Sequence, residues 1–522
     1  MSQHIISKQA MEYMTYNTND LKQNIINIKK IQKQNKLTLA ASEEFLNSLP
    51  YFTVKHTISE NKAFLEYMKS PDKDMKIIHV AGTNGKGSVC NYVSSILLNS
   101  GYHIGMFTSP HLVDITERFK IDGSDISEDV FRDAFCKILD IIEEYNKQKD
   151  HTYSINKTDP INKTNSINKT DPINKTNSIN KTDPINKEDP PKKTDKIDED
   201  DAGFFFPSYF EYLFFMAMIV YTDHPVDYLV LETGLGGLLD VTNTIDKPVV
   251  CVITEIGMDH MQYLGDTYEK IAAHKAGIIK PDVPVIFFDK RPESTQVIRE
   301  TAMQKGARTH MISEESIKNV KLCRDDEGNK YVDFCYDSEY YNYVGLCLHT
   351  SAIYQTQNSA LAISCIEELK NTGALVSYDD IRMGLSGAMW PCRMEEIRPG
   401  FIVDGAHNTD GMEAFLASAR DIDTKGRKIL LFGAVSDKQY KLMASMIGDS
   451  RIFDIIAVTC LKTSRSLDMD RLTDAFKDYD NVSFYDSVSE ATAYIDSIRT
   501  QDDLIFAAGS LYLAGQLRET YD

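Results

Sequence analysis

A glycine-rich turn between a predicted strand and a predicted helix is the strongest chemical signal in the sequence. The turn follows the apolar run 75–81, precedes the helical pattern 89–99 and reads Gly82-Thr83-Asn84-Gly85-Lys86-Gly87-Ser88. Backbone N–H groups and a helix N-terminus bind phosphate at such turns, and Lys86 adds a point charge for the outer phosphates. The turn departs from GxxxxGK[ST], because Gly87 separates Lys86 from Ser88 and the first glycine is displaced. A nucleotide site is favoured over a purely structural turn.

Two further polar residues follow predicted strands. Glu232 closes the apolar run 226–231, and His260 comes after the run 249–254 and directly after Asp259. Open α/β sheets bind ligands at the carboxyl ends of their parallel strands. Glu232 is therefore either a solvated residue at a loop start or a ligand of the cation that accompanies ATP. His260 is either a structural histidine or a metal ligand.

Alternating strand and helix patterns must position these residues. Short Val/Ile/Leu-rich runs that predict buried strands occur at 75–81, 103–107, 226–231, 249–254 and 283–288, with helical patterns such as 89–99 and 268–279 between them. This alternation predicts a mostly parallel sheet covered on both faces. The alternation of strand and helix patterns resumes after residue 398, where the predicted strands are 401–403, 428–432, 452–458 and 503–508. We expect an α/β protein with a large domain at 41–397 and a smaller α/β domain at 398–522.

Three segments stand apart from this pattern. Residues 1–40 predict a peripheral leader with a helix near 21–31. Residues 151–202 carry INKTDP and INKTNS units with a single Ile each, too little burial to offset the entropy of ordering, so we expect a disordered surface insert. The stretch 204–221 is strongly apolar, but only the ten residues 212–221 are unbroken, about half of the ~20 needed for a membrane span. It predicts a buried helix that starts after Pro207.

Composition excludes several classes of protein. The chain has 522 residues, 42% of them hydrophobic and 26% charged, with a formal net charge of −20. These values are ordinary for a globular protein, and the acidic balance disfavours nucleic acid as a partner. Nine scattered cysteines without a CxxC pair indicate neither a disulfide scaffold nor a cysteine zinc site. We expect a cytosolic monomer that does not bind membranes, with a weak organellar address left open.

The turn Gly82–Ser88 is similar to that of folylpolyglutamate synthases and dihydrofolate synthases, the folate branch of the Mur ligase superfamily. Further segments resemble motifs of the same family in the same order. They are 108–112 with 117–118, 208–211, 232–243, 256–260, 264–267, 275–278, 390–393, 404–408, 437–438 and 509–510. The resemblance covers residues 40–520 apart from the insert. It implies a Mur-ligase-like P-loop domain followed by a smaller, Rossmann-like C-terminal domain.

The resemblance also implies how ATP and Mg²⁺ are held. Ser109, Glu232 and His260 become the expected Mg²⁺ ligands, and Lys275 resembles the lysine that the family carbamylates to hold a second ion. The alternative for Lys275 is an exposed helix lysine. The residues that match nucleotide contacts across the domain cleft are Asn358, Arg393, Asp404 and His407, with Gln355 as a further candidate.

Three positions depart from the family pattern. His274 stands where the residue before the lysine is usually Glu, Tyr354 stands where His is usual, and Cys392 replaces a glycine. The last substitution predicts a loop that is less free in φ.

On the pterin side, the family motif maps onto Ser208, Tyr209, Phe210, Glu211, Leu239, Asp240 and Val241. Aromatic rings there would stack on a flat heterocycle, and Asp240 would accept its N–H groups. The competing interpretation is that the aromatic residues belong to the core of a buried helix.

The reaction implied by the resemblance is ATP-dependent ligation of L-glutamate to dihydropteroate, to reduced folates that already carry glutamate, or to both. An acyl phosphate would be the intermediate. The intact pterin-side motif favours the bifunctional type over a folylpolyglutamate synthase alone. Another Mur-type amino-acid ligase is disfavoured by the GKGS and SPHL details. A catalytically inactive nucleotide-binding scaffold is disfavoured because the expected metal and phosphate residues are all present.

Overall fold

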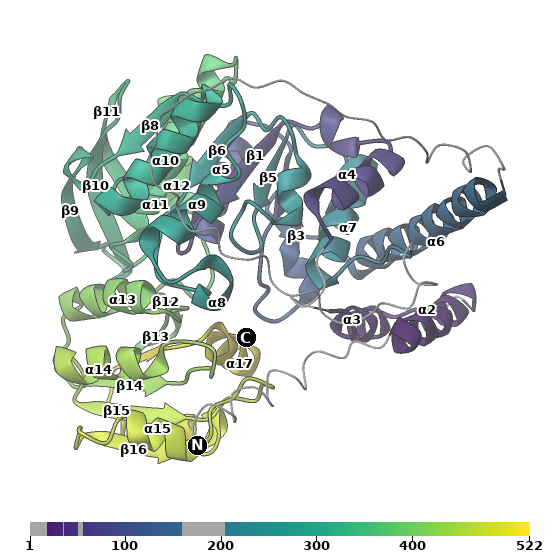
Figure 1. Cartoon of the computed structure of the whole chain (residues 1–522). Coiled ribbons are helices and arrows are strands. Elements are labelled where there is room, and N and C mark those ends of the chain that lie inside the picture. Colours follow the sequence, from purple (N-terminus) through teal and green to yellow (C-terminus); the bar gives the residue numbers. More distant parts are fainter. Residues whose placement is uncertain (1–17, 35, 51–55, 159–203, 522) are drawn as a thin grey trace, which may run out of the picture.

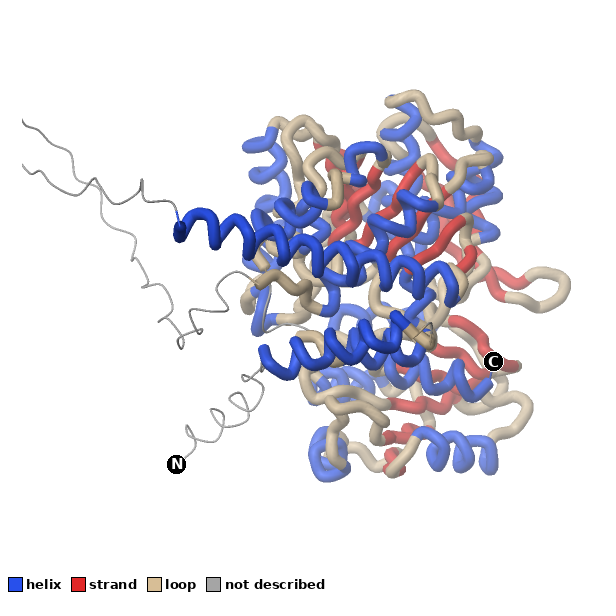
Figure 2. The backbone as a smooth tube through the Cα atoms, turned by 90° about the vertical axis from the view of Figure 1, so that its right-hand side faces the viewer, coloured by secondary structure: helices blue, strands red, loops and turns tan. Residues whose placement is uncertain are grey.

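The computed structural model describes residues 18–34, 36–50, 56–158 and 204–521. They form two α/β domains, and in Figure 1 the smaller, C-terminal domain (green to yellow) lies below the larger one. The strands fall into separate groups in the two domains (Figure 2). The predicted fold class, a mostly parallel α/β domain followed by a second α/β domain, is confirmed.

The large domain is built on an eight-stranded sheet. Six neighbouring strands run parallel, and two short strands at one edge are antiparallel. In spatial order the strands are β4 (Ser124–Asp125), β3 (Phe119–Ile121), β2 (Ile104–Phe107), β5 (Tyr228–Glu232), β1 (Ile77–Ala81), β6 (Val250–Ile253), β7 (Val285–Phe288) and β8 (Thr309–Ile312). All five strands predicted for this domain are present.

The register of the central strands gathers three loops at one edge of the sheet. Strand β1 pairs in parallel with β5 and β6, so that Val80 lies opposite Glu232 and Ala81 opposite Ile253. The turn after Ala81 therefore emerges beside Glu232 and Thr254. This explains how residues 150 positions apart in sequence come to share a site.

Helices cover both faces of this sheet. Ile78 and Val80 pack with α5, α11 and α12 on one face, and Ile77 packs with α6 and α7 on the other. The helices of the large domain are α2 (Thr18–Lys33), α3 (Leu39–Asn47), α4 (Ile58–Tyr67), α5 (Lys86–Asn99), α6 (Glu128–Thr158), α7 (Tyr209–Asp223), α8 (Met261–Leu264), α9 (Tyr268–Ala276), α10 (Pro292–Lys305), α11 (Gln355–Asn371) and α12 (Tyr378–Gly387). Short 3₁₀ turns lie at Pro71–Asp74, Ile115–Arg118, Val241–Thr244 and Glu314–Ser316.

The apolar stretch near residue 210 forms the buried helix that the sequence predicts. Helix α7 begins after Ser208, whose side chain and Glu211 form a capping box, and Tyr212 to Met218 are fully buried. Across the parts of the chain that the structure describes, no helix is long and apolar enough to cross a membrane.

The predicted insert falls mainly outside the described residues, and the predicted leader falls outside them at 1–17 and 35. Helix α6 extends to Thr158, past the start of the predicted insert, and residues 159–203 lie outside the described part. In the predicted leader, α2 confirms the expected helix, and its Leu21 and Ile28 are buried against the core.

The sequence did not predict a three-stranded antiparallel sheet between β8 and α11. It comprises β9 (Ile317–Arg324), β10 (Lys330–Asp337) and β11 (Asn342–Leu348) in the order β11-β10-β9. Strand β9 is largely solvent-exposed and β10 is buried only at alternate residues, so neither shows the continuous apolar run of a buried parallel strand.

A buried carboxyl group joins this small sheet to α11. Glu367 accepts a hydrogen bond from the Tyr343 hydroxyl (3.0 Å) and another from Ser338, with Glu339 and Lys370 nearby. Burial raises its pKa from the ordinary 4.5 to about 7. The folded chain therefore binds this proton more tightly than the unfolded chain, and the resulting stabilisation is lost as the pH rises from about 4.5 through 7.

We expect Glu367→Gln to be more stable than the parent chain at pH 8 by on the order of 2–3 kcal/mol, because glutamine keeps the acceptor oxygen without the buried charge. At pH 4.5 the difference should largely vanish. Urea unfolding at both pH values measures it, with the exposed Glu300→Gln as the control. An equal difference at both pH values would contradict the assignment.

The C-terminal domain has its own six-stranded sheet, parallel except for one edge strand. In order the strands are β12 (Glu395–Arg398), β13 (Phe401–Val403), β17 (Leu504–Ala508), β14 (Lys428–Phe432), β15 (Ile455–Thr459) and β16 (Val482–Tyr485). The helices are α13 (Thr409–Asp421), α14 (Tyr440–Ser450), α15 (Met469–Ala475), α16 (Val488–Ile498) and α17 (Leu511–Tyr521). The four strands predicted here are present, and the sheet begins three residues before the predicted boundary at 397/398.

Candidate functional site

A cavity of about 590 Å³ lies between the two domains. Both domains contribute to its walls, and most of the residues predicted for the nucleotide and metal sites line it. From the large domain these are Gly82–Ser88, Ser109, Glu232, His260, Lys275 and Asn358, and from the C-terminal domain Asp404 and His407, with Arg393 at the boundary.

The glycine-rich turn places the N-terminus of α5 at this cavity. Gly85 caps the helix at φ +84°, a left-handed conformation that favours glycine, and a Cβ atom there would lie 2.2 Å from Asn358 Oδ1. A Cβ atom on Gly82 would lie 1.7 Å from Thr254 Oγ1. At Gly82 and Gly85 the turn therefore packs too closely against its neighbours to hold a side chain, and the whole turn lines the cavity.

Lys86 and Glu232 face each other across the cavity floor. Lys86 Nζ lies 3.7 Å from Glu232 Oε1 and donates to the carbonyl oxygen of Thr83 (3.3 Å). Glu232 is 2% exposed, and its Oε2 accepts a hydrogen bond from the backbone N–H of Ser109 (3.1 Å). Burial raises the pKa of Glu232, although Lys86 and the Ser109 N–H oppose the rise. A cation near this carboxylate would offset the cost of its burial.

His260 lies at the start of α8 with φ +51°. Burial lowers its pKa to about 4, although the neighbouring Asp259 opposes the shift. The imidazole is therefore neutral at neutral pH, the form that ligates metals. Asp259 itself keeps a pKa well below its ordinary value: burial alone would raise it, but His407, Lys438 and His260 outweigh burial.

The donor set fits a hard cation shared with a nucleotide. Within the described ranges, no group of three His, Cys, Asp or Glu side chains gathers as a metal site. The predicted ligands include only two such side chains, Glu232 and His260, together with the Ser109 hydroxyl. A Mg²⁺ ion bound there would take its remaining ligands from water and phosphate oxygens, which is usual for this ion.

Lys275 is buried rather than exposed on its helix. Its Nζ donates to the carbonyl oxygen of Gly82 (2.6 Å), so the lysine lies directly beneath the turn. Burial, reinforced by Lys86, lowers its pKa well below the ordinary value. His274, the unusual neighbour, is half-buried, and burial lowers its pKa as well. These conditions favour a neutral amine at Lys275.

The loop before β12 adopts the conformation that a glycine would favour, despite its cysteine. Cys392 lies at φ +54°, so the predicted restriction in φ does not prevent the left-handed geometry. Its N–H donates to Glu395 Oε2 (2.8 Å), and its carbonyl oxygen accepts from Gly405 N and Arg393 Nη1 (both 2.8 Å). These bonds offset a conformational cost of about 1–2 kcal/mol.

Tyr354 also departs from the family pattern, and it links the two domains. Its hydroxyl donates to Asp404 Oδ2 (2.6 Å), and Asp404 also accepts from the backbone N–H of Ala406 (2.8 Å). Burial raises the pKa of Asp404, while Arg393 and Tyr354 oppose the rise.

The amides at the start of α11 reach the turn. Asn358 lines the cavity, whereas Gln355 lies behind it, donating to Ser88 Oγ (3.1 Å) and accepting from Asn358 Nδ2 (2.8 Å). Trp390 begins the segment 390–393 that resembles a family motif, but the sequence did not assign it to the site. Its ring lies so close to Gly87 that a Cβ atom there would be 2.7 Å from Trp390 Cζ2.

The residues predicted for the pterin side do not line this cavity. Tyr209 is buried in the core, and the partly buried Phe210 packs against the same core. Glu211 accepts hydrogen bonds from Ser208 N (2.8 Å), His56 N (3.0 Å) and Asn61 Nδ2 (3.0 Å). These contacts support the interpretation that the aromatic residues belong to the core. A role in binding pterin stays a prediction.

The loop 239–241 is held by Asp240. Its carboxylate accepts from Leu235 N (2.9 Å) and from the Thr242 hydroxyl (2.7 Å), while Val241 is buried and Leu239 is exposed. Asp240 thus has a structural function in the loop, whatever it binds.

Residues 392–511 match the family model described as Mur ligase, glutamate ligase domain. A dihydrofolate synthase/folylpolyglutamate synthase of Bacillus subtilis is 28% identical over 474 residues, covering 90% of this chain and 95% of that protein. Along most of its length the chain is therefore similar to folylpolyglutamate synthases and dihydrofolate synthases.

Solved structures agree with this assignment. A folylpolyglutamate synthase from Thermotoga maritima is 27% identical and superposes with a TM-score of 0.68, covering 92% of this chain and 96% of the other. A solved FPGS–AMPPCP complex is 25% identical with a TM-score of 0.70, covering 93% and 99%.

Proposed function

We propose that this protein uses ATP to ligate L-glutamate to dihydropteroate and to the γ-glutamyl chains of reduced folates. The proposal rests on one interdomain cavity. It is lined by the phosphate-binding turn, which includes Lys86, and by Glu232, His260 and Arg393. The similarity to an FPGS–AMPPCP complex supports the nucleotide, and the similarity to the bifunctional Bacillus subtilis enzyme supports both acceptors.

The reaction needs an activated acid. A carboxylate oxygen of the acceptor attacks the γ-phosphorus of ATP, the bond to the β-phosphate oxygen breaks, and ADP leaves an acyl phosphate. The amine of glutamate then attacks the acyl carbon, and phosphate departs from the tetrahedral intermediate. Phosphoryl transfer depends mainly on positioning and charge neutralisation.

The chain's own residues supply that neutralisation. The backbone of Gly82–Ser88 and the N-terminus of α5 would bind the phosphates, Lys86 would contact the outer ones, and Arg393 would approach from the other domain. Asn358, Asp404 and His407 would hold the rest of the nucleotide.

We propose that Ser109, Glu232 and His260 hold Mg²⁺, and that a carbamylated Lys275 holds a second ion. When bound, these ions would neutralise charge on the phosphate oxygens. We further infer a reducing compartment, such as the cytosol, because all nine cysteines are free thiols, and we expect a monomer.

Glutamate-dependent ADP release by the purified chain tests the function, measured with dihydropteroate, with tetrahydrofolate and with neither acceptor. Release with both acceptors is the expected result. Release with tetrahydrofolate alone would reduce the proposal to a folylpolyglutamate synthase. No glutamate-dependent release with either acceptor would overturn it in favour of an inactive nucleotide-binding scaffold.

A further inference from the structure

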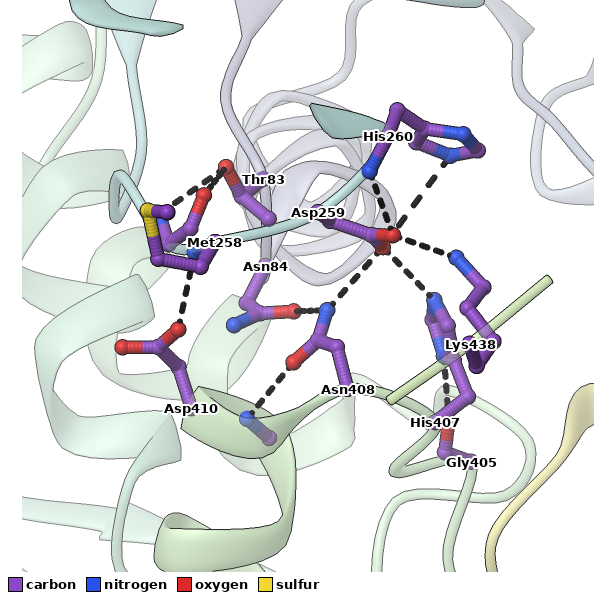
Figure 3. Close-up of polar contacts among 12 residues, drawn as sticks. Thr83, Asn84, Met258, Asp259, His260, Gly405, His407, Asn408, Asp410 and Lys438 are labelled. Carbon is purple, nitrogen blue, oxygen red and sulfur yellow. Dashed lines mark hydrogen bonds and ion pairs between the residues drawn. The ribbon is translucent and has the colours of Figure 1, made fainter. Parts of the chain in front are cut away.

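The segment Ile256–His260 carries His260 to the cavity, and the C-terminal domain holds it from one side. The backbone N–H of Met258 donates to Asp410 Oδ2 (2.9 Å). The buried carboxylate of Asp259 accepts from Lys438 Nζ (2.6 Å) and from Asn408 Nδ2 (3.2 Å). Figure 3 shows these contacts converging on the segment. Met258 and Asp259 are therefore each bound to the other domain.

Asp410 joins two parts of the large domain. Besides Met258, it pairs with Arg291 (2.7 Å), whose guanidinium lies over the ring of Tyr268 at 4.3 Å. A Cβ atom on Gly257 would lie 2.7 Å from Asp410 Oδ2, so the backbone and the carboxylate are in direct contact. Asp410 is 3% exposed, and water therefore has little access to these bonds.

On its other side, the segment contacts the phosphate-binding turn. The Thr83 hydroxyl accepts from Gly257 N (2.9 Å) and donates to Gly257 O (3.1 Å). Asn408 Nδ2 reaches Asn84 Oδ1 (2.9 Å) as well as Asp259. The segment is thus held between the turn and the C-terminal domain.

Lys438 and Asp410 do not contact the space that a substrate would fill. Neither residue lines the cavity, and the Lys438 side chain is only 9% exposed with its ammonium group directed at Asp259. The N–H of His260 in turn donates to Asp259 Oδ1 (2.8 Å). The position of Lys438 is therefore transmitted to His260 through Asp259.

We propose that Lys438 and Asp410 are positioning residues that form an interdomain latch: they hold the segment 256–260, and with it His260, in its working place when the two domains are closed. Only the role of His260 in this statement rests on the proposed function. The latch makes the position of His260 depend on the C-terminal domain. ATP would therefore react only when the two domains are closed.

Hydrogen exchange of the segment tests the latch without reference to activity. In Lys438→Met and in Asp410→Ala, the amides of Met258 and His260 should exchange at least ~10-fold faster than in the parent chain, with little change in the amides of β14 and β15. Lys441→Met is the matched control, because Lys441 lies three residues away and pairs with Asp474 on the surface (2.7 Å). Unchanged exchange at 256–260 in both variants would overturn the proposal.

Kinetics separate positioning from direct binding. Lys438→Met should lower kcat for ADP release by at least ~10-fold and change KM for ATP by less than ~3-fold, and Lys438→Arg should recover part of the loss. A raised KM with unchanged kcat would mean that Lys438 binds the nucleotide itself, and would also overturn the latch. If the parent chain released no ADP, the proposed function would fail, while the exchange measurement would still decide the latch. Should Lys438→Met fail to fold, Lys438→Arg and Asp410→Ala carry the same two measurements.

Discussion

A chain carrying Lys86→Ala is expected to release ADP in the presence of glutamate about 10²–10³-fold more slowly than the parent chain. Lys86 is the positive charge nearest the Glu232 carboxylate, at 3.7 Å, and it lies in the turn that would bind the phosphates. Removing one preorganised charge contact from a water-excluded site costs rate of this size. A coupled assay of ADP release at saturating glutamate measures the effect.

The fold should survive this change, because Lys86 contributes no core packing. The melting temperature should move by only a few degrees, and Lys137→Ala, on a surface lysine paired with Asp223, should leave activity unchanged. A folded Lys86→Ala protein with more than about a tenth of the parent rate would remove Lys86 from the proposed phosphate site.

Lys275→Ala is the second change with a large expected effect. The amine of Lys275 is buried beneath Gly82, and burial holds its pKa well below the ordinary value, which favours the neutral form that can add CO₂. Adding CO₂ forms an N–C bond, releases the amine proton and leaves a carbamate anion beside Lys86. Loss of that anion, and of the ion we propose it holds, should lower the rate about 10²–10³-fold.

Mass spectrometry under non-denaturing conditions gives an independent measurement. The parent chain kept in bicarbonate should be heavier by one CO₂ than the same chain kept free of CO₂, and Lys275→Arg should show no such difference. Full activity of Lys275→Arg, or equal masses in the two buffers together with full activity, would show that the carbamate is not needed.

Much of the large domain follows from local sequence. The strand before Gly82, the glycine-rich turn and the helix after it are coded by adjacent residues, and the central strands are mostly apolar runs. Because parallel strands end at the same edge of their sheet, the meeting of Lys86 with Glu232 could be predicted as well. Their distance could not, since it depends on the register of β1 and β5.

The interdomain contacts could not be predicted in the same way. Lys438 and Asp259 are separated by 179 positions, and no periodic pattern marks two such residues as partners. Arg291 and Asp410 are ordinary charged residues in the sequence, and only the fold brings Arg291, at the start of α10, beside Asp410 in α13. The antiparallel strands β9–β11 were not predicted for another reason: their alternating polar residues resemble those of exposed loops.

Trp390 is the only tryptophan in the chain, and it lies against Gly87 on the wall of the cavity. The protein therefore carries one indole fluorophore, placed at the phosphate-binding turn. Because indole emission responds to the polarity around the ring, titration with a nucleotide can be followed by fluorescence in the unlabelled protein. No background from other tryptophans would dilute that signal.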